Sequence, residues 1–187
     1  MRTVWPRLLA GLVAGALLLG GCGEESHTPR PLPKPSKSAS PSASASATPP
    51  VMPAAAKAKT KAGAVAFTES FLDALNYAGA TGDTQPLRIL YMRLCTRCEA
   101  IADGIDQTYA KGGSIKGGEW HATRFTFHAI KNEVAFVDAW VDYDAQTWTK
   151  AAGRKPTEFP GSQRNLKAFN LRWTSGGWRI SALDPRA

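Results

Sequence analysis

The spacing of apolar residues predicts a long first helix over residues 54–80. Most residues in this stretch are good helix formers. Large apolar side chains recur at intervals of four, four and three, which places them on one helical face: Phe67, Phe71, Leu75 and Ala78. Gly79 and Gly82 are expected to end the helix, because glycine is favoured at the C-terminal cap.

Two further helices are predicted from the same kind of pattern. The second is expected to begin at Asp83 or Thr84, with Pro86 in its first turn, and to continue to residue 94. The third is expected over about residues 96–111, where two consecutive glycines end it.

After Gly113 the period of the apolar pattern changes from 3.6 to 2. This alternation predicts four strands, over residues 120–130, 133–144, 166–173 and 178–183. The polar stretch 150–163, which contains two prolines, is expected to be a loop. Because helices come first and strands afterwards, we expect an α+β domain with N-terminal helices packed on an antiparallel sheet.

The first 21 residues have the layout of a secretory signal peptide. Arg2 and Arg7 precede an uncharged apolar run from Leu8 to Leu19, and two glycines lead to Cys22. The run of about 12 residues is too short for a bilayer, which takes roughly 20. The Leu-Gly-Gly-Cys sequence resembles a bacterial lipobox, whose cysteine receives a diacylglycerol with acyl chains such as palmitate. We therefore expect a lipoprotein anchored through Cys22 at the extracytoplasmic face of the cell membrane.

Residues 22–53 are expected to be a disordered tether that begins at the lipidated cysteine. They are rich in proline, serine and alanine and contain almost no large apolar side chains. Such a composition cannot bury enough surface to offset the entropy of ordering the chain. A single α+β domain is expected over residues 54–187.

The distribution of charge argues against a nucleic-acid partner. The formal net charge is +8, but residues 1–62 alone hold eight basic and two acidic residues. The folded part is therefore nearly balanced, and it lacks the basic stripe with interleaved aromatics that a nucleic-acid footprint needs.

Cys95 and Cys98 remain as an even pair once Cys22 is lipidated. An oxidising compartment favours a structural disulfide between them, and helical residues three apart lie about 5 Å from each other at Cα. A redox-active Cys-x-x-Cys is the alternative, although the motif here follows a helix and not a strand. Zinc would need four ligands, and His121 and His128 lie on opposite faces of one predicted strand, so no metal site is expected.

The order of these features resembles two known groups of proteins. Three helices followed by strands that end in a Gly-Gly-Trp-Arg hairpin resemble the nuclear transport factor 2-like fold, a cone in which a curved antiparallel sheet wraps around a long first helix. The chain also resembles a family of uncharacterised actinobacterial lipoproteins with a domain of unknown function. That family has no assigned activity, so the resemblance implies a fold and a location. The motifs that carry it are Leu75-Asn76-Tyr77-Ala78, Thr81-Gly82-Asp83-Thr84, Cys95-x-x-Cys98, Gly117-Gly118-Glu119-Trp120, Phe159-Pro160-Gly161 and Gly176-Gly177-Trp178-Arg179.

A cone of this kind implies a candidate pocket beside the strand predicted over residues 133–144. Isomerases and dehydratases with such folds hold an aspartate general base in an apolar pocket. The alternative is that this strand face is solvated, because several carboxylates on one face are costly to bury together. Trp140 and Trp148 are the tryptophans expected to line a cavity or a partner surface. The candidate pocket residues are Tyr109, His128, Asp138, Trp140 and Asp142.

The chain contains no glycine-rich phosphate loop, nucleophile elbow or zinc-protease motif. We therefore expect no cofactor and a non-catalytic domain that binds an extracytoplasmic protein or a small apolar ligand. The alternative function is a small-molecule isomerase or dehydratase that uses the sheet pocket. A thiol oxidoreductase that uses the Cys-x-x-Cys motif is a third interpretation.

Overall fold

The computed structural model describes residues 48–185, so the expected signal peptide, Cys22 and most of the tether lie outside the described residues. The helices are η1 (Ala54–Lys57), α1 (Lys61–Thr81), α2 (Gln85–Arg88) and α3 (Thr96–Ala110). The strands are β1 (Ser114–Gly117), β2 (Trp120–Lys131), β3 (Val134–Tyr143), β4 (Gln146–Thr149), β5 (Thr157–Phe159), β6 (Ser162–Thr174) and β7 (Gly177–Pro185). None of the helices in this part of the chain is long and apolar enough to cross a membrane.

The first predicted helix is in fact two elements. The short 3-10 helix η1 ends at Lys57, and the chain is extended at Ala58 and Thr60 before α1 begins. The Thr60 side chain starts α1 by accepting a hydrogen bond from the backbone N–H of Gly63 at 3.0 Å. Gly82, at φ 80°, ends the helix as predicted, whereas Gly79 lies inside it.

The second predicted helix is much shorter than expected, because its C-terminal half pairs with a strand. Helix α2 ends at Arg88, and Tyr91 then forms a parallel bridge with Ile180 of β7. The Ile180 N–H donates to Leu90 O at 2.9 Å, and the Met92 N–H donates to Ile180 O at 2.8 Å. These strand-like bonds replace the helical ones. The prediction of the third helix is confirmed to within one residue at its C-terminal end.

The four predicted strands are all present, and three short strands accompany them. Strands β1, β4 and β5 form a small sheet in the order β1-β4-β5, while the larger sheet has the order β2-β3-β6-β7. The prediction of a loop over residues 150–163 was therefore wrong in part, because this stretch contains β5 and the first residues of β6. Every strand pair within the sheets is antiparallel, as expected.

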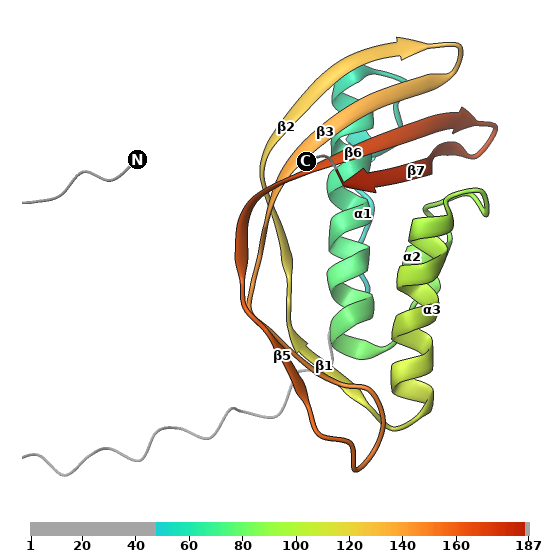
Figure 1. Ribbon diagram of the computed structural model, residues 1–187. Coiled ribbons are helices and arrows are strands. Elements are labelled where there is room, and N and C mark those ends of the chain that lie inside the picture. Colours follow the sequence, from blue (N-terminus) through green and yellow to red (C-terminus); the bar gives the residue numbers. More distant parts are fainter. Residues whose placement is uncertain (1–47, 186–187) are drawn as a thin grey trace, which may run out of the picture. The chain divides into compact units, whose positions relative to one another are not determined.

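The two sheets are joined by three segments that bend as they cross from one to the other. Figure 1 shows β1 running on into β2, β3 into β4 and β5 into β6. Gly117 and Gly118 make the first bend with φ of 67° and 81°, values that L side chains rarely adopt. The Gly118 N–H donates to Ala145 O across the bend at 3.1 Å, and the Asp144 N–H donates to Glu119 O at 3.1 Å. Pairing therefore continues through the bend, and the result is a strongly curved surface.

Helix α1 lies on the concave side of this curved surface, with α3 beside it (Figure 1). The inward face of β3 packs against α1 through small and β-branched side chains that are completely buried: Ala135, Val137, Ala139 and Val141. Phe71 of α1 meets Phe169 of β6 edge-on at 6.0 Å between ring centroids. The predicted α+β class, with helices on one face of a curved antiparallel sheet, is confirmed.

A side chain from α1 holds the edge of the large sheet next to the bend. Asn76 Nδ2 donates to Trp120 O at 3.0 Å, and the Trp120 N–H donates to Asn76 Oδ1 at 2.8 Å. Trp120 is the first residue of β2, and β2 is an edge strand. The amide thus takes the place of a neighbouring strand and satisfies two backbone groups that would otherwise lack a partner.

We expect Asn76→Ala to lower the free energy of unfolding by about 2–3 kcal/mol, because it leaves two half-buried backbone groups of Trp120 unpaired. Urea denaturation would measure the change. Glu69→Ala, at an exposed position of the same helix, is the matched control and should change stability by less than about 0.5 kcal/mol. Equal stabilities of the two variants would contradict the role given to Asn76.

Candidate functional site

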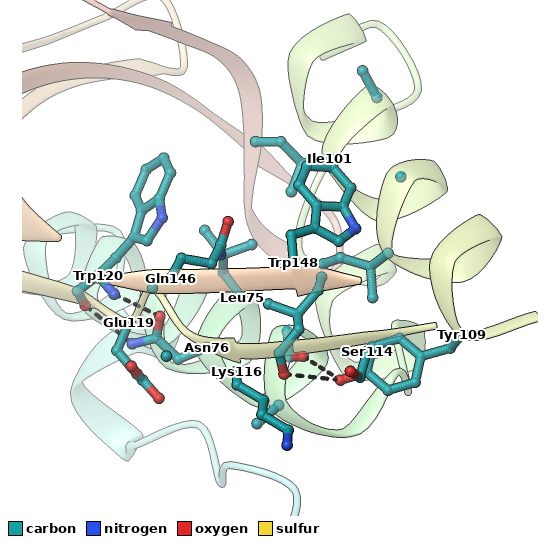
Figure 2. A pocket seen from close by; sticks show the side chains of 18 of the residues that line it. Leu75, Asn76, Ile101, Tyr109, Ser114, Lys116, Glu119, Trp120, Gln146 and Trp148 are labelled. Atoms are coloured by element: carbon teal, nitrogen blue, oxygen red, sulfur yellow. Dashed lines mark hydrogen bonds between the residues drawn. The ribbon is translucent and has the colours of Figure 1, made fainter. Parts of the chain in front are cut away.

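A cavity of about 800 Å³ lies between α1, α3 and the small sheet. Figure 2 shows its walls, with Leu75 from α1, Ile101 and Tyr109 from α3, and Trp148 from β4. This volume lies within the range of small-molecule sites, which are typically concave and mostly apolar with a few polar groups. The cavity is therefore large enough to hold a ligand.

The polar atoms of the two aromatic walls are already bonded within the protein. Trp148 Nε1 donates to Thr108 Oγ1 at 2.9 Å, and the Tyr109 hydroxyl donates to Gly79 O at 2.7 Å (Figure 2 shows the Tyr109 bond). These bonds fix the orientation of each ring and occupy its polar group. What the rings offer to a ligand is mainly apolar surface.

Two glycines inside helices keep the cavity open. Gly79 of α1 and Gly104 of α3 both line it, and a Cβ added at either position would meet no atom within 4 Å. Neither has the positive φ that would require glycine. Glycine within a helix lowers the free energy of unfolding by about 1 kcal/mol relative to alanine. Each of these glycines therefore reduces stability, although no neighbouring atom requires glycine there.

A second hollow of about 420 Å³ adjoins the first, and the two share Arg97, Ile101, Gly118, Trp120 and Gln146. Its wall contains the paired rings of Trp120 and Tyr143, whose centroids are 4.8 Å apart. Burial raises the pKa of Tyr143 to about 12, so its hydroxyl is neutral at physiological pH. Because the two hollows share these lining residues, they are together called the concave groove below.

The structure separates the five candidate pocket residues. Tyr109 lines the concave groove, whereas the other four line neither of its two hollows: His128, Asp138, Trp140 and Asp142. On β3 the two aspartates and Trp140 alternate with the buried core residues, so they lie on the face turned away from α1. The five residues therefore do not line one cavity.

The outward face of β3 nevertheless has defined side-chain contacts. Asp138 is 8% exposed, and its Oδ2 lies 2.8 Å from His128 Nε2. Arg124 and Arg164 lie over the Trp140 ring at 5.3 and 6.0 Å from its centroid. Asp142 accepts a hydrogen bond from the Arg164 N–H at 2.7 Å. Of the two tryptophans singled out from the sequence, Trp148 lines the large cavity and Trp140 does not.

The structure contains a disulfide between Cys95 and Cys98, with a Cα–Cα distance of 5.3 Å. Both cysteines are 1% exposed, which leaves the sulfur atoms little access to a thiol in solution. The disulfide spans the first turn of α3. Arg97, which lines the concave groove, lies between the two cysteines in the sequence. Within residues 48–185, no group of three or more His, Cys, Asp or Glu residues is placed to hold a metal ion.

Helix α3 is held to α2 by a cluster of charges around Arg88. Its guanidinium donates to Glu99 at 3.1 Å, to Asp103 at 2.7 Å and to Asp106 at 2.6 Å. The hydrogen bonds that the guanidinium donates to Asp103 and Asp106 raise the pKa of Arg88. Burial raises the pKa of the neighbouring Tyr91 to about 12. One cation thus anchors three turns of the helix that forms a wall of the groove.

Residues 36–184 match a family of unknown function, DUF6318. The chain belongs to this family. The match runs from before η1 to Asp184, one residue before the end of β7, so the curved sheet, the groove and the disulfide all lie within the family's domain. No protein with a curated description matches the chain.

Solved structures resemble the chain in fold alone. The intermembrane space region of the chloroplast protein ARC6 is 11% identical, with a TM-score of 0.53 over 70% of this chain and 98% of that one. An NTF2-like protein of unknown function from Shewanella baltica is 13% identical, with a TM-score of 0.40 over 70% and 99% of the two chains. An NTF2-like protein with a cystatin-like fold from Novosphingobium aromaticivorans is 13% identical, with a TM-score of 0.38 over 63% and 77%.

Several residues of the groove were not expected from the sequence. Gly104 could have been noticed as a glycine within a helical pattern, which usually has a packing or functional reason. Lys167 and Trp120 gave no such signal, because their side chains meet only when the sheet curves. In the sequence, Asn76 is an ordinary polar position on a predicted helix. Its role depends on hydrogen bonds to β2, which only the folded structure shows.

We expect the disulfide to be structural, so both cysteines of native protein should resist alkylation until the chain is unfolded and reduced. Replacing both with serine should cost at most about 2 kcal/mol of unfolding free energy, because the closed loop is short. Mass spectrometry after alkylation and urea denaturation would measure these effects. Rapid reduction of the native disulfide, with turnover of insulin as a substrate, would instead favour the oxidoreductase interpretation.

Proposed function

We propose that this protein is a membrane-anchored extracytoplasmic lipoprotein whose folded domain binds a small apolar ligand in the concave groove without catalysing a reaction. The proposal has two parts. The binding part rests on the groove, and the location rests on the first 53 residues of the sequence.

The observation that carries the binding part is the pair of helical glycines. Gly79 and Gly104 face an 800 Å³ cavity, and neither is required by backbone conformation or by a neighbouring atom. Larger residues there would favour both helices and fill the space. Sites that depart from local stability rules in this way are commonly functional. The apolar walls indicate the class of ligand.

The arrangement of titratable groups favours binding over catalysis. An isomerase or dehydratase would need a carboxylate or histidine directed into the cavity and oriented by a neighbour. Asp138 and His128 form such a pair, but they lie on the opposite side of the large sheet from the groove. Asp144 lines the smaller hollow and lies 2.9 Å from His121, but both side chains are more than half exposed, so this pair is not recessed in an apolar site. Within the groove, the Tyr109 hydroxyl is engaged by the carbonyl of Gly79.

The location part of the proposal follows from the order of the N-terminal features. A basic start, an apolar run and the Leu-Gly-Gly-Cys sequence end at Cys22, and a segment rich in proline and serine leads to the domain. Acyl chains on Cys22 would hold the protein at the membrane, and the tether would set the distance between the groove and the bilayer surface.

We expect Gly104→Leu to abolish binding of a neutral apolar dye while leaving the protein at least as stable as wild type. The leucine side chain fills the cavity, and loss of a helical glycine should add about 0.5–1 kcal/mol to the free energy of unfolding. Nile red fluorescence and urea denaturation would measure the two effects on the full chain.

Gln107→Leu is the matched control, because it adds the same side chain to an exposed position of α3 that does not line the cavity. It should leave dye binding unchanged. If wild type fails to bind the dye, or if Gly104→Leu binds it as tightly as wild type does, the groove is not the site of an apolar ligand.

We expect Cys22→Ser to move the protein from the membrane fraction to the soluble extracytoplasmic fraction, because the serine cannot receive the thioether-linked lipid. Cell fractionation followed by immunoblotting would measure the distribution. Cys95→Ser, which removes a cysteine of the disulfide and not the lipidation site, is the control and should stay with the membrane. Unchanged membrane association of Cys22→Ser would contradict the anchoring proposal.

A further inference from the structure

Two cationic side chains line the smaller hollow of the concave groove. Arg97 comes from the first turn of α3 and Lys167 from the inward face of β6, and both line this hollow. Arg97 also lines the large cavity and a third hollow beside β7, so it lies where these spaces meet. Residues that are 70 apart in the sequence are thus brought to one place by the fold.

Neither cation has a carboxylate partner. Within residues 48–185, no Asp or Glu oxygen lies within 4.0 Å of the charged nitrogens of Arg97 or Lys167. Asp144, which also lines the smaller hollow, is bonded to His121 at 2.9 Å. Two positive charges therefore line the groove without an ion-pair partner among the described residues.

Lys167 is placed as a binding group and not as a freely solvated lysine. Its Nζ lies over the rings of Trp120 and Tyr143, at 5.9 and 5.4 Å from their centroids. Its partial burial and the charge of Arg97 lower its pKa from the usual lysine range. An anion bound between the two cations would offset the repulsion between them, so the site is electrostatically complementary to negative charge.

The rest of the groove suits an apolar body. Ile101, Leu183 and Phe159 surround the smaller hollow, and the large cavity continues along α3 toward Trp148. A molecule bound by the cations at one end would have its remaining atoms against apolar and aromatic walls. A small hydrophilic anion would leave the larger cavity unfilled, so a molecule with both an acidic and an apolar part matches the groove better.

We propose that the concave groove binds an anionic amphiphile, whose single acidic headgroup lies between Arg97 and Lys167 and whose hydrocarbon chain occupies the large cavity. This inference rests on the proposed binding function and names its ligand class. The headgroup chemistry is that of a carboxylate or a phosphate monoester, both of which accept hydrogen bonds from arginine and lysine.

The test compares three ligands with the same twelve-carbon chain: dodecanol, dodecanoate and dodecyl phosphate. Calorimetric titration would use the full chain with Cys22→Ser, below the concentration at which each compound forms micelles. We expect at least one of the two anions to bind about 10-fold more tightly than the alcohol, because a charge-assisted contact replaces a neutral one. The anion with the higher affinity identifies the headgroup.

Arg97→Met and Lys167→Met keep the apolar stems of these side chains and remove their charges. Each should weaken binding of the preferred anion by about 10-fold and leave dodecanol binding within about 2-fold of wild type. Lys116→Met is the matched control, because Lys116 is an exposed cation that lines the large cavity away from the pair. It should leave the affinities for all three ligands unchanged.

The outcomes separate this inference from the proposed function. Equal affinities of the anions and the alcohol would overturn the anionic assignment and leave an apolar binding site. A loss of anion affinity in Lys116→Met that equals the loss in Lys167→Met would overturn the assignment of the headgroup to this pair of residues. Absence of binding by all three ligands would overturn both the inference and the proposed function.

Discussion

The two hydrogen bonds between the Asn76 side chain and the backbone of Trp120 are the contact on which the concave groove depends. They join the helix at the centre of the domain to the first residue after the bend in the sheet. Without them the edge of β2 would have unpaired backbone groups beside a hollow. With them, the position of the bend relative to α1 is defined. The two hollows meet at this point, and Trp120 lines both.

Helix stability is reduced beside the groove, and other interactions of α3 compensate for this reduction. Glycines inside α1 and α3 reduce helix stability where the two helices face the cavity. Two other kinds of interaction hold α3. Arg88 forms ion pairs with its carboxylates, and the Cys95–Cys98 disulfide bridges its first turn. These interactions hold α3 in place, although the cavity prevents the helix from packing closely along one side. This is the arrangement expected of a preformed binding site.

How much of the fold could be predicted depended on the length of each element. The alternation of Ala135, Val137 and Ala139 with outward side chains is a local property of the chain, and β3 lies where it was expected. Strands β1, β4 and β5 have four residues or fewer, too few to show a period. The length of the second helix was overestimated, because residues 90–92 form backbone hydrogen bonds with β7. The pattern of neighbouring residues cannot predict a partner that is distant in the sequence.

The sequence by itself determined the class of the fold, the order of its longer helices and strands and the pairing of its two neighbouring cysteines. All of these depend on residues close to one another in the chain. Only the tertiary structure decided which side of the sheet holds the large cavity. It separated Tyr109 from Asp138, although the sequence offered them as members of one pocket, and it brought Arg97 and Lys167 together from a helix and a distant strand. The physical reason is that a cavity is made by the curvature of a sheet around a helix, and curvature is a property of the assembled strands.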